Sequence, residues 1–385
     1  MTIPRAAPCP LTYILRVSAA LRAAEGADDG ACLCYRIWYI IISLIHLAAQ
    51  RRSQDEGPDI LSETMTTIDI LVSEVGPRDG LQSIDAIMPT DAKKRWVDVQ
   101  AAAGCREIEV GSFVPATILP QLADTAEIVA HARSIAGLTV AVLVPNLRGA
   151  EDAIAAGAHK ISIPFSVSET HSLKNVRRNH EQMFEEVRKI ARRVAEVDPA
   201  ERPHFEAGLS TAFGCTIEGP IAEDLVVKSA ETLMECGCAE VGLSDTTGYA
   251  NPAQVRRLIR KVRGAVGEKN LTGVHLHNTR GLGLANALAA IEEGITTIDS
   301  SLGGLGGCPY APGASGNIVT EDLVFMLDAM GLETGIDLDS LLDVRQILID
   351  ALPGEPLYGF TPDAGLPLGY GQMNDASQSK KPVAL

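Results

Sequence analysis

Short runs of apolar and β-branched residues alternate with longer amphipathic stretches from residue 68 onward. Each run precedes a helix-like segment, which is the pattern of repeated strand–helix units around a parallel sheet. Near-continuous apolar character in the runs favours strands that are buried on both faces. Eight consecutive units favour a closed barrel, so we predict an α/β fold, a (β/α)8 TIM barrel. The expected strands are residues 68–75, 106–112, 138–144, 159–165, 204–211, 239–245, 271–277 and 296–302.

Two further amphipathic segments, residues 318–332 and 338–352, predict extra C-terminal helices that close the barrel. A doubly wound sheet is the alternative fold, but it would place a glycine-rich phosphate turn after an early strand. The segment GPRDGLQ (76–82) is not such a turn. We therefore expect residues 67–350 to form one barrel domain and residues 351–385 to form a C-terminal tail with a polar end.

The first part of the chain, residues 1–66, lacks this pattern, and we expect it to be an N-terminal extension outside the folded domain. Residues 37–50 are uncharged, but Arg36 and Arg51 bound them, and a membrane span needs about 20 apolar residues. We therefore expect no stable membrane span. Residues 1–24 contain arginines and no acidic residue, which resembles a transit peptide. We expect a cytoplasmic protein, or a mitochondrial matrix protein if this segment acts as a transit peptide.

The charge of the 385-residue chain is strongly acidic, at −16, and 46% of its residues are hydrophobic. General affinity for nucleic acid or for an anionic membrane would usually need an electropositive face, so we expect no nucleic-acid partner. The eight cysteines form neither a disulfide framework of the small secreted kind nor a pair of zinc-finger motifs. This cysteine usage favours reduced thiols in a reducing compartment.

Polar residues with catalytic potential follow the expected strands at their carboxyl ends. A barrel of this class builds its active site from those ends, so we expect these side chains to converge on one site. They are Arg78 and Asp79 after the first strand, Glu109 near the end of the second, Asp245 at the end of the sixth, His275 and His277 at the end of the seventh, and Cys308 and Asn317 after the eighth.

Four of these residues predict a metal site. His275 and His277 are two apart on a strand, so their side chains point to the same face, although either is also compatible with an ordinary core histidine. Asp79 and Asn317 follow the first and eighth strands, which adjoin the seventh in a closed barrel. Two imidazole nitrogens and two oxygens suit an octahedral divalent ion such as Mg²⁺ or Mn²⁺, with zinc or cobalt as alternatives. Such an ion lowers the pKa of a bound hydroxyl, as carbon–carbon cleavage beside a hydroxyl requires.

The other polar residues have two interpretations each. Arg78 beside Asp79 is suited to stabilising an oxyanion, or forms only a local salt bridge. Glu109 and Asp245 orient Arg78 or a water, or satisfy backbone groups. In the glycine-rich segment 303–317, Cys308 is placed to pass a proton to a carbanion, or is incidental to the backbone architecture.

The segments GPRDGLQ, IEVGSFV, HLHNT and GLGGCPYAPGASGNIVTEDLV resemble the 3-hydroxy-3-methylglutaryl-CoA (HMG-CoA) lyase family over residues 68–345. The resemblance implies a divalent metal, an acyl-CoA substrate and a homodimer. It also implies roles for particular residues: metal binding by Asp79, His275, His277 and Asn317, and catalysis by Arg78 and Cys308 with support from Glu109 and Asp245. We also expect substrate contacts by Arg78, Gln82 and Arg280, with capping of the barrel rim as the alternative for Arg280.

The reaction that the resemblance implies is cleavage of HMG-CoA to acetyl-CoA and acetoacetate, by an oxo-acid-lyase. Asp79 or His275 would remove the hydroxyl proton, Arg78 would stabilise the enolate, and Cys308 would assist its protonation.

One segment departs from the family pattern: many members read HxHDTYGQALAN where this chain has HLHNTRGLGLAN. Citramalyl-CoA or a longer-branched 3-hydroxyglutaryl-CoA therefore remains an alternative substrate. A Claisen-condensing synthase, an aldolase acting on 4-hydroxy-2-oxo acids and a non-catalytic binding protein are further alternatives.

Overall fold

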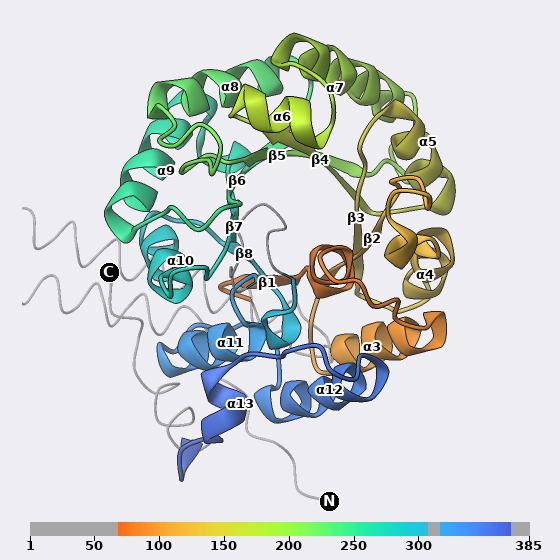
Figure 1. The fold of residues 1–385 in the computed structure, drawn as a ribbon, viewed down its shortest axis with the longest axis vertical. Helices are drawn as coiled ribbons and strands as arrows, with labels where there is room; N and C mark the ends of the chain where they lie inside the picture. Colours follow the sequence, from red (N-terminus) through yellow and green to blue (C-terminus); the bar gives the residue numbers. More distant parts are fainter. Residues whose placement is uncertain (1–67, 307–315, 371–385) are drawn as a thin grey trace, which may run out of the picture. The chain divides into compact units, whose positions relative to one another are not determined.

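Eight parallel strands close into a barrel in the computed structural model, which describes residues 68–306 and 316–370 (Figure 1). Each strand pairs with its neighbours in sequence, and β8 pairs with β1. Every expected strand overlaps an observed one, so the predicted (β/α)8 barrel is confirmed. The strands are β1 (Leu71–Glu74), β2 (Glu107–Ser112), β3 (Thr139–Leu143), β4 (Lys160–Ser166), β5 (His204–Ser210), β6 (Glu240–Asp245), β7 (Gly273–Leu276) and β8 (Thr297–Ser300).

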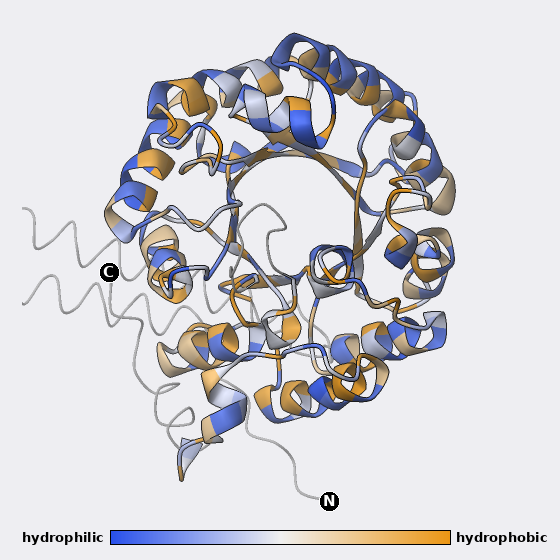
Figure 2. Ribbon diagram, in the orientation of Figure 1, coloured by the Kyte–Doolittle hydropathy of each residue, from blue (hydrophilic) through white to orange (hydrophobic). Residues whose placement is uncertain are grey.

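Helices surround the barrel and turn their apolar sides toward the strands (Figure 2). In α7, for example, Met183, Val187, Ile190 and Val194 are buried at helical spacing, while a capping box between Asn179 and Gln182 starts the helix. The helices are α3 (Thr90–Ala102), α4 (Thr125–Ala132), α5 (Leu147–Ala156), α6 (Glu169–Asn175), α7 (His180–Ala195), α8 (Glu223–Glu235), α9 (Pro252–Val266), α10 (Gly283–Glu292), α11 (Thr320–Ala329), α12 (Leu338–Ala351) and α13 (Phe360–Ala364). Shorter helical turns are η1 (Gly76–Gly80), η2 (Pro120–Leu122), η3 (Glu268–Asn270) and η4 (Leu302–Gly304).

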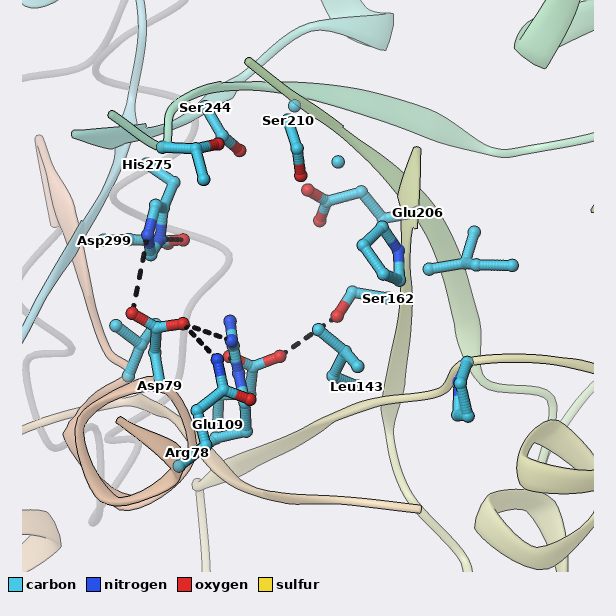
Figure 3. A pocket seen from close by; sticks show the side chains of 18 of the residues that line it. Arg78, Asp79, Glu109, Leu143, Ser162, Glu206, Ser210, Ser244, His275 and Asp299 are labelled. Atoms are coloured by element: carbon cyan, nitrogen blue, oxygen red, sulfur yellow. Dashed lines mark hydrogen bonds and ion pairs between the residues drawn. The ribbon is translucent and has the colours of Figure 1, made fainter. Parts of the chain in front are cut away.

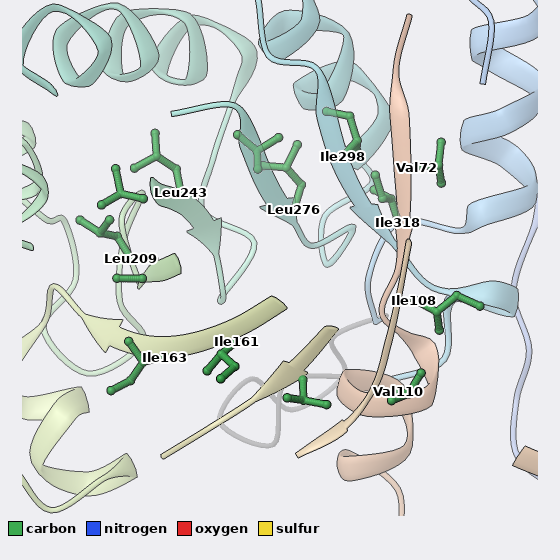
Figure 4. Packing of buried hydrophobic residues seen from close by; sticks show 14 of the residues in the cluster. Val72, Ile108, Val110, Ile161, Ile163, Leu209, Leu243, Leu276, Ile298 and Ile318 are labelled. Carbon is green, nitrogen blue, oxygen red and sulfur yellow. The ribbon is translucent and has the colours of Figure 1, made fainter. Parts of the chain in front are cut away.

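The two faces of the strands differ in character. On β2, Ile108 and Val110 are buried among other apolar side chains of the core (Figure 4), whereas Glu107 and Glu109 line a cavity within the barrel. All six residues of β2 are buried, as expected, but its inner face carries polar side chains. Successive side chains of a strand point to opposite faces, so polar residues that alternate with apolar ones, such as Glu107 and Glu109, share the inner face. With glycines and serines at other inner positions, they leave a cavity of about 730 Å³.

The C-terminal helices complete the ring. α12 packs against both α3 and α11, which joins the last unit of the barrel to the first. Within the expected tail, residues up to 370 also pack on the barrel. The backbone N–H of Tyr358 donates to the Gly303 carbonyl at 2.7 Å, and the Asp322 carboxylate accepts hydrogen bonds from the N–H groups of Phe360 and Thr361.

Several predictions fall on residues outside the described ranges. They concern the N-terminal extension (1–66), including the apolar segment 37–50, as well as Cys308 and the polar end of the tail from residue 371. Among residues 68–306 and 316–370, no helix is both long and apolar enough to cross a membrane.

Candidate active site and metal centre

Arg78 and Asp79 lie on η1, a single π-helical turn that follows β1 directly. Such turns occur often at functional sites, because they redirect side chains out of the regular helical spacing. The turn begins at Gly76, whose N–H donates to the Glu74 carboxylate at 2.8 Å. A Cβ at residue 76 would lie 2.5 Å from that carboxylate and 2.9 Å from the Trp96 ring, so only glycine fits here. Buried packing around the turn holds both functional side chains at the cavity.

The Arg78 guanidinium is held between two carboxylates (Figure 3). Its Nε donates to Glu109 Oε2 and its Nη1 to Asp79 Oδ1, both at 2.5 Å. Glu109 reaches this position from the inner face of β2 and also accepts from the Ser162 hydroxyl at 3.0 Å. Burial raises the pKa of Glu109, although Arg78 opposes this shift. These contacts match the proposed role of Glu109 in orienting Arg78.

Asp79, His275 and His277 converge, with their potential ligand atoms within 4.8 Å of one another. The two histidine Nε2 atoms are 3.1 Å apart, and Asp79 Oδ2 lies 3.9 Å from each. Asn317 joins them, because its Nδ2 donates to Asp79 Oδ2 at 2.8 Å and its backbone forms a β-bridge with His277. The structure thus brings together all four residues that we expect to bind the metal.

Electrostatics at this cluster favour the protonation states that a metal requires for Asp79 and His277. Burial would raise the pKa of Asp79, but Arg78 and the two histidines hold it well below its usual range, so Asp79 is a carboxylate. Burial and the neighbouring His275 lower the pKa of His277 to about 4. His277 is therefore a neutral imidazole at neutral pH, as a metal ligand must be.

Unpartnered buried atoms test whether the cluster fits a metal ion. Among the described residues, His277 Nδ1 and Asn317 Oδ1 are buried without a hydrogen-bond partner. Buried polar atoms without partners are costly and point to a missing ion or water. An orphaned amide oxygen, a carboxylate and two facing imidazoles form a donor set without thiolate. These residues fit a divalent cation with a preference for oxygen and nitrogen ligands.

Asp299 is a site residue that the sequence analysis missed. It lies on the inner face of β8 in register with His275, and its Oδ2 is 3.0 Å from His275 Nδ1. Burial would lower the pKa of His275, but the hydrogen bond to Asp299 and the charge of Asp79 raise it. A carboxylate on the second nitrogen of a metal-binding histidine fixes its tautomer and ring orientation. The sequence feature that could have identified Asp299 is an aspartate at an inward position of the strand next to the histidine pair.

Gln82 lies within the cluster. Its Nε2 donates to Asp79 Oδ1 at 2.8 Å, and the residue lines the cavity, so it is placed both to hold Asp79 and to meet a ligand.

Asp245 and Arg280 make contacts with the backbone. The Asp245 carboxylate accepts from the N–H groups of Tyr249 and Ala250, at 2.8 and 3.1 Å, and burial raises its pKa to about 6. Arg280 Nη1 donates to the carbonyls of Thr247 and Gly248, and its guanidinium lies 5.0 Å from the Tyr249 ring centroid. Neither residue lines the cavity. These contacts to the loop between β6 and α9 support the alternatives in which Asp245 satisfies backbone groups and Arg280 caps the barrel rim.

The cavity floor is also charged. Lys160 on β4 bridges Glu107 at 3.2 Å and Glu206 at 2.8 Å. Burial would lower the pKa of Lys160, but Glu206 and Glu107 raise it well above its usual value. The lysine is therefore a structural cation beneath the site, and it lacks the neutral amine that a nucleophile would need.

Residues 69–348 match the family model described as HMGL-like. A mitochondrial hydroxymethylglutaryl-CoA lyase of Mus musculus is 38% identical over 283 residues, which cover 74% of this chain and 86% of the relative. The hydroxymethylglutaryl-CoA lyase YngG of Bacillus subtilis is 37% identical, over 75% of this chain and 94% of its own length.

Solved structures of HMG-CoA lyases are also similar to this chain. An HMG-CoA lyase from Acinetobacter baumannii, in complex with coenzyme A and 3-methylmalate, is 40% identical with a TM-score of 0.72, covering 78% of this chain and 97% of that one. The HMG-CoA lyase of Bacillus subtilis is 36% identical with a TM-score of 0.73, over 77% of this chain and 98% of that one. Because the family model spans more than half of the sequence and relatives of this identity cover most of it, the chain belongs to the HMG-CoA lyase-like (HMGL-like) family.

Proposed function

We propose that this protein is a metal-dependent lyase that cleaves HMG-CoA to acetyl-CoA and acetoacetate. The observation that carries the proposal is the convergence of Arg78 with Asp79, His275 and His277 at the carboxyl end of one barrel. The named function of the relatives supports the substrate, since lyases that act on HMG-CoA are similar over most of this chain. The relative whose structure contains coenzyme A supports an acyl-CoA ligand.

The metal would be held by Asp79, His275, His277 and Asn317, and we propose Mg²⁺ or Mn²⁺. A bound divalent ion supplies a Lewis acid that lowers the pKa of the substrate hydroxyl. Cleavage would begin with loss of that hydroxyl proton, and we propose that Asp79 or His275 accepts it. The oxygen then becomes the ketone of acetoacetate as the carbon–carbon bond breaks, and the bonding electrons form the enolate of acetyl-CoA.

Arg78 stabilises the negative charge of this enolate in our proposal. Within the described residues, Glu109 and Asp79 engage two of its five N–H donors, and the guanidinium also lines the cavity. Fixed donors aimed at a developing oxyanion cost little reorganisation during the reaction. The enolate carbon finally takes up a proton, and we propose that Cys308 assists this step.

Acetyl-CoA release from purified protein tests the function. We expect cleavage of HMG-CoA with Mg²⁺ or Mn²⁺, loss of activity with a chelator, and a preference over citramalyl-CoA and a longer-branched analogue. Arg78→Gln should lower kcat about 100-fold or more, because it removes the charge opposite the enolate. A wild-type protein that cleaves none of the three thioesters, with either metal present, would refute the proposal.

Two finer proposals accompany the function. We propose a homodimer, with support from exposed apolar side chains in the C-terminal region such as Ile349 and Phe360. Light scattering after size-exclusion chromatography measures the oligomeric state directly.

We also propose a cytoplasmic location, or the mitochondrial matrix if residues 1–24 direct import. Relatives named for both compartments support either, and imaging of a tagged full-length chain distinguishes them.

A further inference from the structure

A row of serines continues the inner surface of the barrel from the metal cluster. Ser244 on β6 pairs in register with His275 on β7, and Ser73 on β1 pairs with Asp299 on β8. Ser210 on β5 comes next in the row, one residue beyond the register pairs of β5 and β6. We call Ser73, Ser210 and Ser244 the serine row, and all three line the cavity. Figure 3 shows Ser210 and Ser244 on the wall of the cavity that faces the arginine and the aspartate of η1.

The hydroxyl groups of the serine row are free to bind a ligand. Within residues 68–306 and 316–370, none of the three serines forms a hydrogen bond through its side chain. Ser73 is only 3% exposed, so bulk solvent does not satisfy its hydroxyl. Ser162, another inward serine, differs because its hydroxyl donates to Glu109 at 3.0 Å. Buried polar groups without a protein partner point to a water or a ligand, so the serine row offers hydrogen bonds to a molecule in the cavity.

Glycines leave open space beside the serine row. Gly208, Gly242 and Gly273 are inward positions of β5, β6 and β7 that line the cavity. A Cβ placed at residue 208 would meet one described atom within 4 Å apart from its chain neighbours, the Ser244 hydroxyl oxygen at 3.9 Å. Barrels of this class usually fill their interior with bulky branched side chains. This barrel instead leaves room next to the hydroxyl groups.

The shape of the cavity determines how a thioester substrate lies in it. The CoA portion is much larger than the acyl group, so it leaves through the mouth while the hydroxyl of the acyl group meets the metal cluster. The substituents on the hydroxyl-bearing carbon then point into the barrel, toward the serine row and Gly208. In HMG-CoA one of these substituents is a methyl group, which leaves space for a water molecule bonded to the serines. A branch that ends in a hydroxyl group replaces this water and keeps its hydrogen bonds.

We propose that the serine row selects thioesters with a polar branch, so that the site also cleaves 3-hydroxy-3-(hydroxymethyl)glutaryl-CoA. The bonds change as in the HMG-CoA reaction. The hydroxyl on the branched carbon gives its proton to a base of the site, the bond from this carbon to the carbon beside the thioester breaks, and the enolate of acetyl-CoA takes up a proton. The second product is 4-hydroxy-3-oxobutanoate. This inference rests on the proposed function, since it takes the substrate to be a 3-hydroxyacyl thioester of CoA.

The test compares two branches of nearly equal size, hydroxymethyl and ethyl. We expect kcat/KM of the wild type to be at least about tenfold higher for the hydroxymethyl thioester than for 3-hydroxy-3-ethylglutaryl-CoA, because ethyl displaces the water without replacing its hydrogen bonds. In Ser210→Ala/Ser244→Ala this ratio should fall to near one. A wild-type ratio near one, or an unchanged ratio in the variant, would overturn the inference. The control Ser134→Ala/Ser340→Ala changes two exposed serines outside the cavity and should keep the wild-type ratio.

A second variant tests the open space. Gly208→Val places a branched side chain beside the Ser244 hydroxyl, and residue 208 has no positive φ that would strain a valine. We expect the ratio of kcat/KM for the hydroxymethyl thioester to kcat/KM for HMG-CoA to fall about tenfold, because the larger branch loses its place. Gly264→Val, an exposed change on α9 outside the cavity, is the matched control and should keep the wild-type ratio. An unchanged ratio in Gly208→Val would contradict the inference.

Calorimetric titration separates this inference from the proposed function. If the wild type cleaves HMG-CoA but not the hydroxymethyl thioester, the inference is overturned and the function stands. If the wild type cleaves no thioester, the function is refuted and binding decides the inference. Tighter binding of the hydroxymethyl than of the ethyl thioester, with the difference lost in Ser210→Ala/Ser244→Ala, would support the serine row. Equal affinities, a difference that the variant keeps, or no binding by the wild type would overturn it.

Discussion

His275 and Asp299 form a hydrogen-bonded pair at the candidate metal site. The hydrogen bond between them leaves His275 Nε2 directed toward His277 and Asp79. Without Asp299, the ring would be free to rotate or to adopt the other tautomer. We therefore propose that the carboxylate positions His275 for metal binding and is not itself a ligand.

We predict that Asp299→Asn weakens Mn²⁺ binding about 10- to 100-fold, because an amide holds the imidazole less strongly than a carboxylate does. Calorimetric titration of the metal measures this without reference to turnover. Asp328→Asn is the matched control, since Asp328 is a half-buried carboxylate that bonds the Tyr370 hydroxyl, away from the cavity. Equal metal affinity for Asp299→Asn and wild type would show that His275 needs no such support.

Glu74 is a fully buried carboxylate next to η1, and it connects η1, η4, α3 and α11. It accepts hydrogen bonds from the N–H groups of Gly76 and Leu302 and from the side chains of Gln100 and Thr320. Burial raises its pKa to about 7 despite these bonds.

A raised pKa makes the folded state bind the proton more tightly than the unfolded state does. The resulting stability is present below pH 4.5 and is lost as the pH rises through about 7. We predict that Glu74 contributes a decrease of about 3 kcal/mol in unfolding free energy across this range. Urea denaturation at several pH values should show a flatter profile for Glu74→Gln than for wild type. Parallel profiles would mean that Glu74 titrates at its ordinary pKa.

At the scale of elements, one face of each strand packs in the hydrophobic core and the other face lines the cavity. On β4, Ile161 and Ile163 lie in the apolar layer (Figure 4), whereas Ser162 points into the cavity (Figure 3). Lys160 also lines the cavity. The outer layer supplies the hydrophobic free energy of the barrel, and the inner layer is available for chemistry. Neighbouring residues of one strand should therefore respond differently to truncation.

We predict that Ile161→Ala lowers the unfolding free energy by about 2–5 kcal/mol, because it leaves a void in a fully buried layer. Ser162→Ala should cost about 1 kcal/mol, since it removes one hydrogen bond to Glu109 beside an open cavity. Urea denaturation of the two variants measures both values. Similar losses would contradict the division of the strand into a core face and a site face.

The whole molecule depends on its last segment as well as on the barrel. Residues 353–370 bond to η4 and to the first turn of α11, and these elements flank the loop that carries Asn317. We propose that the folded unit runs from residue 67 to residue 370, with residues 1–66 dispensable.

Two truncated chains test this proposal. We predict that a chain of residues 67–370 keeps the Tm and activity of the full protein. A chain of residues 67–352 should have a Tm lower by several degrees, because it loses the bonds to Gly303 and Asp322. Thermal unfolding followed by circular dichroism gives both values. Equal Tm for the two truncations would place the end of the folded unit at residue 352 or before it.

The strand positions and the residue types of the candidate metal site were predictable from sequence alone. Strands follow from local apolar patterns, and an HxH pair places two imidazoles on one face whatever the rest of the fold does. Membership of the family was also visible, because its segments are contiguous and specific. These features depend on residues that are close together in the chain.

Contacts between distant residues were decided only by the tertiary structure. Asn317 meets Asp79 across 238 residues, and Arg78 meets Glu109 across 31, because closure of the barrel brings β1 beside both β2 and β8. The same closure directs interspersed polar residues such as Asp299 into the cavity. Sequence therefore determined which groups the site contains. Only the register of the closed sheet decided which of them touch, since hydrogen bonds and charge pairs depend on distance in space rather than along the chain.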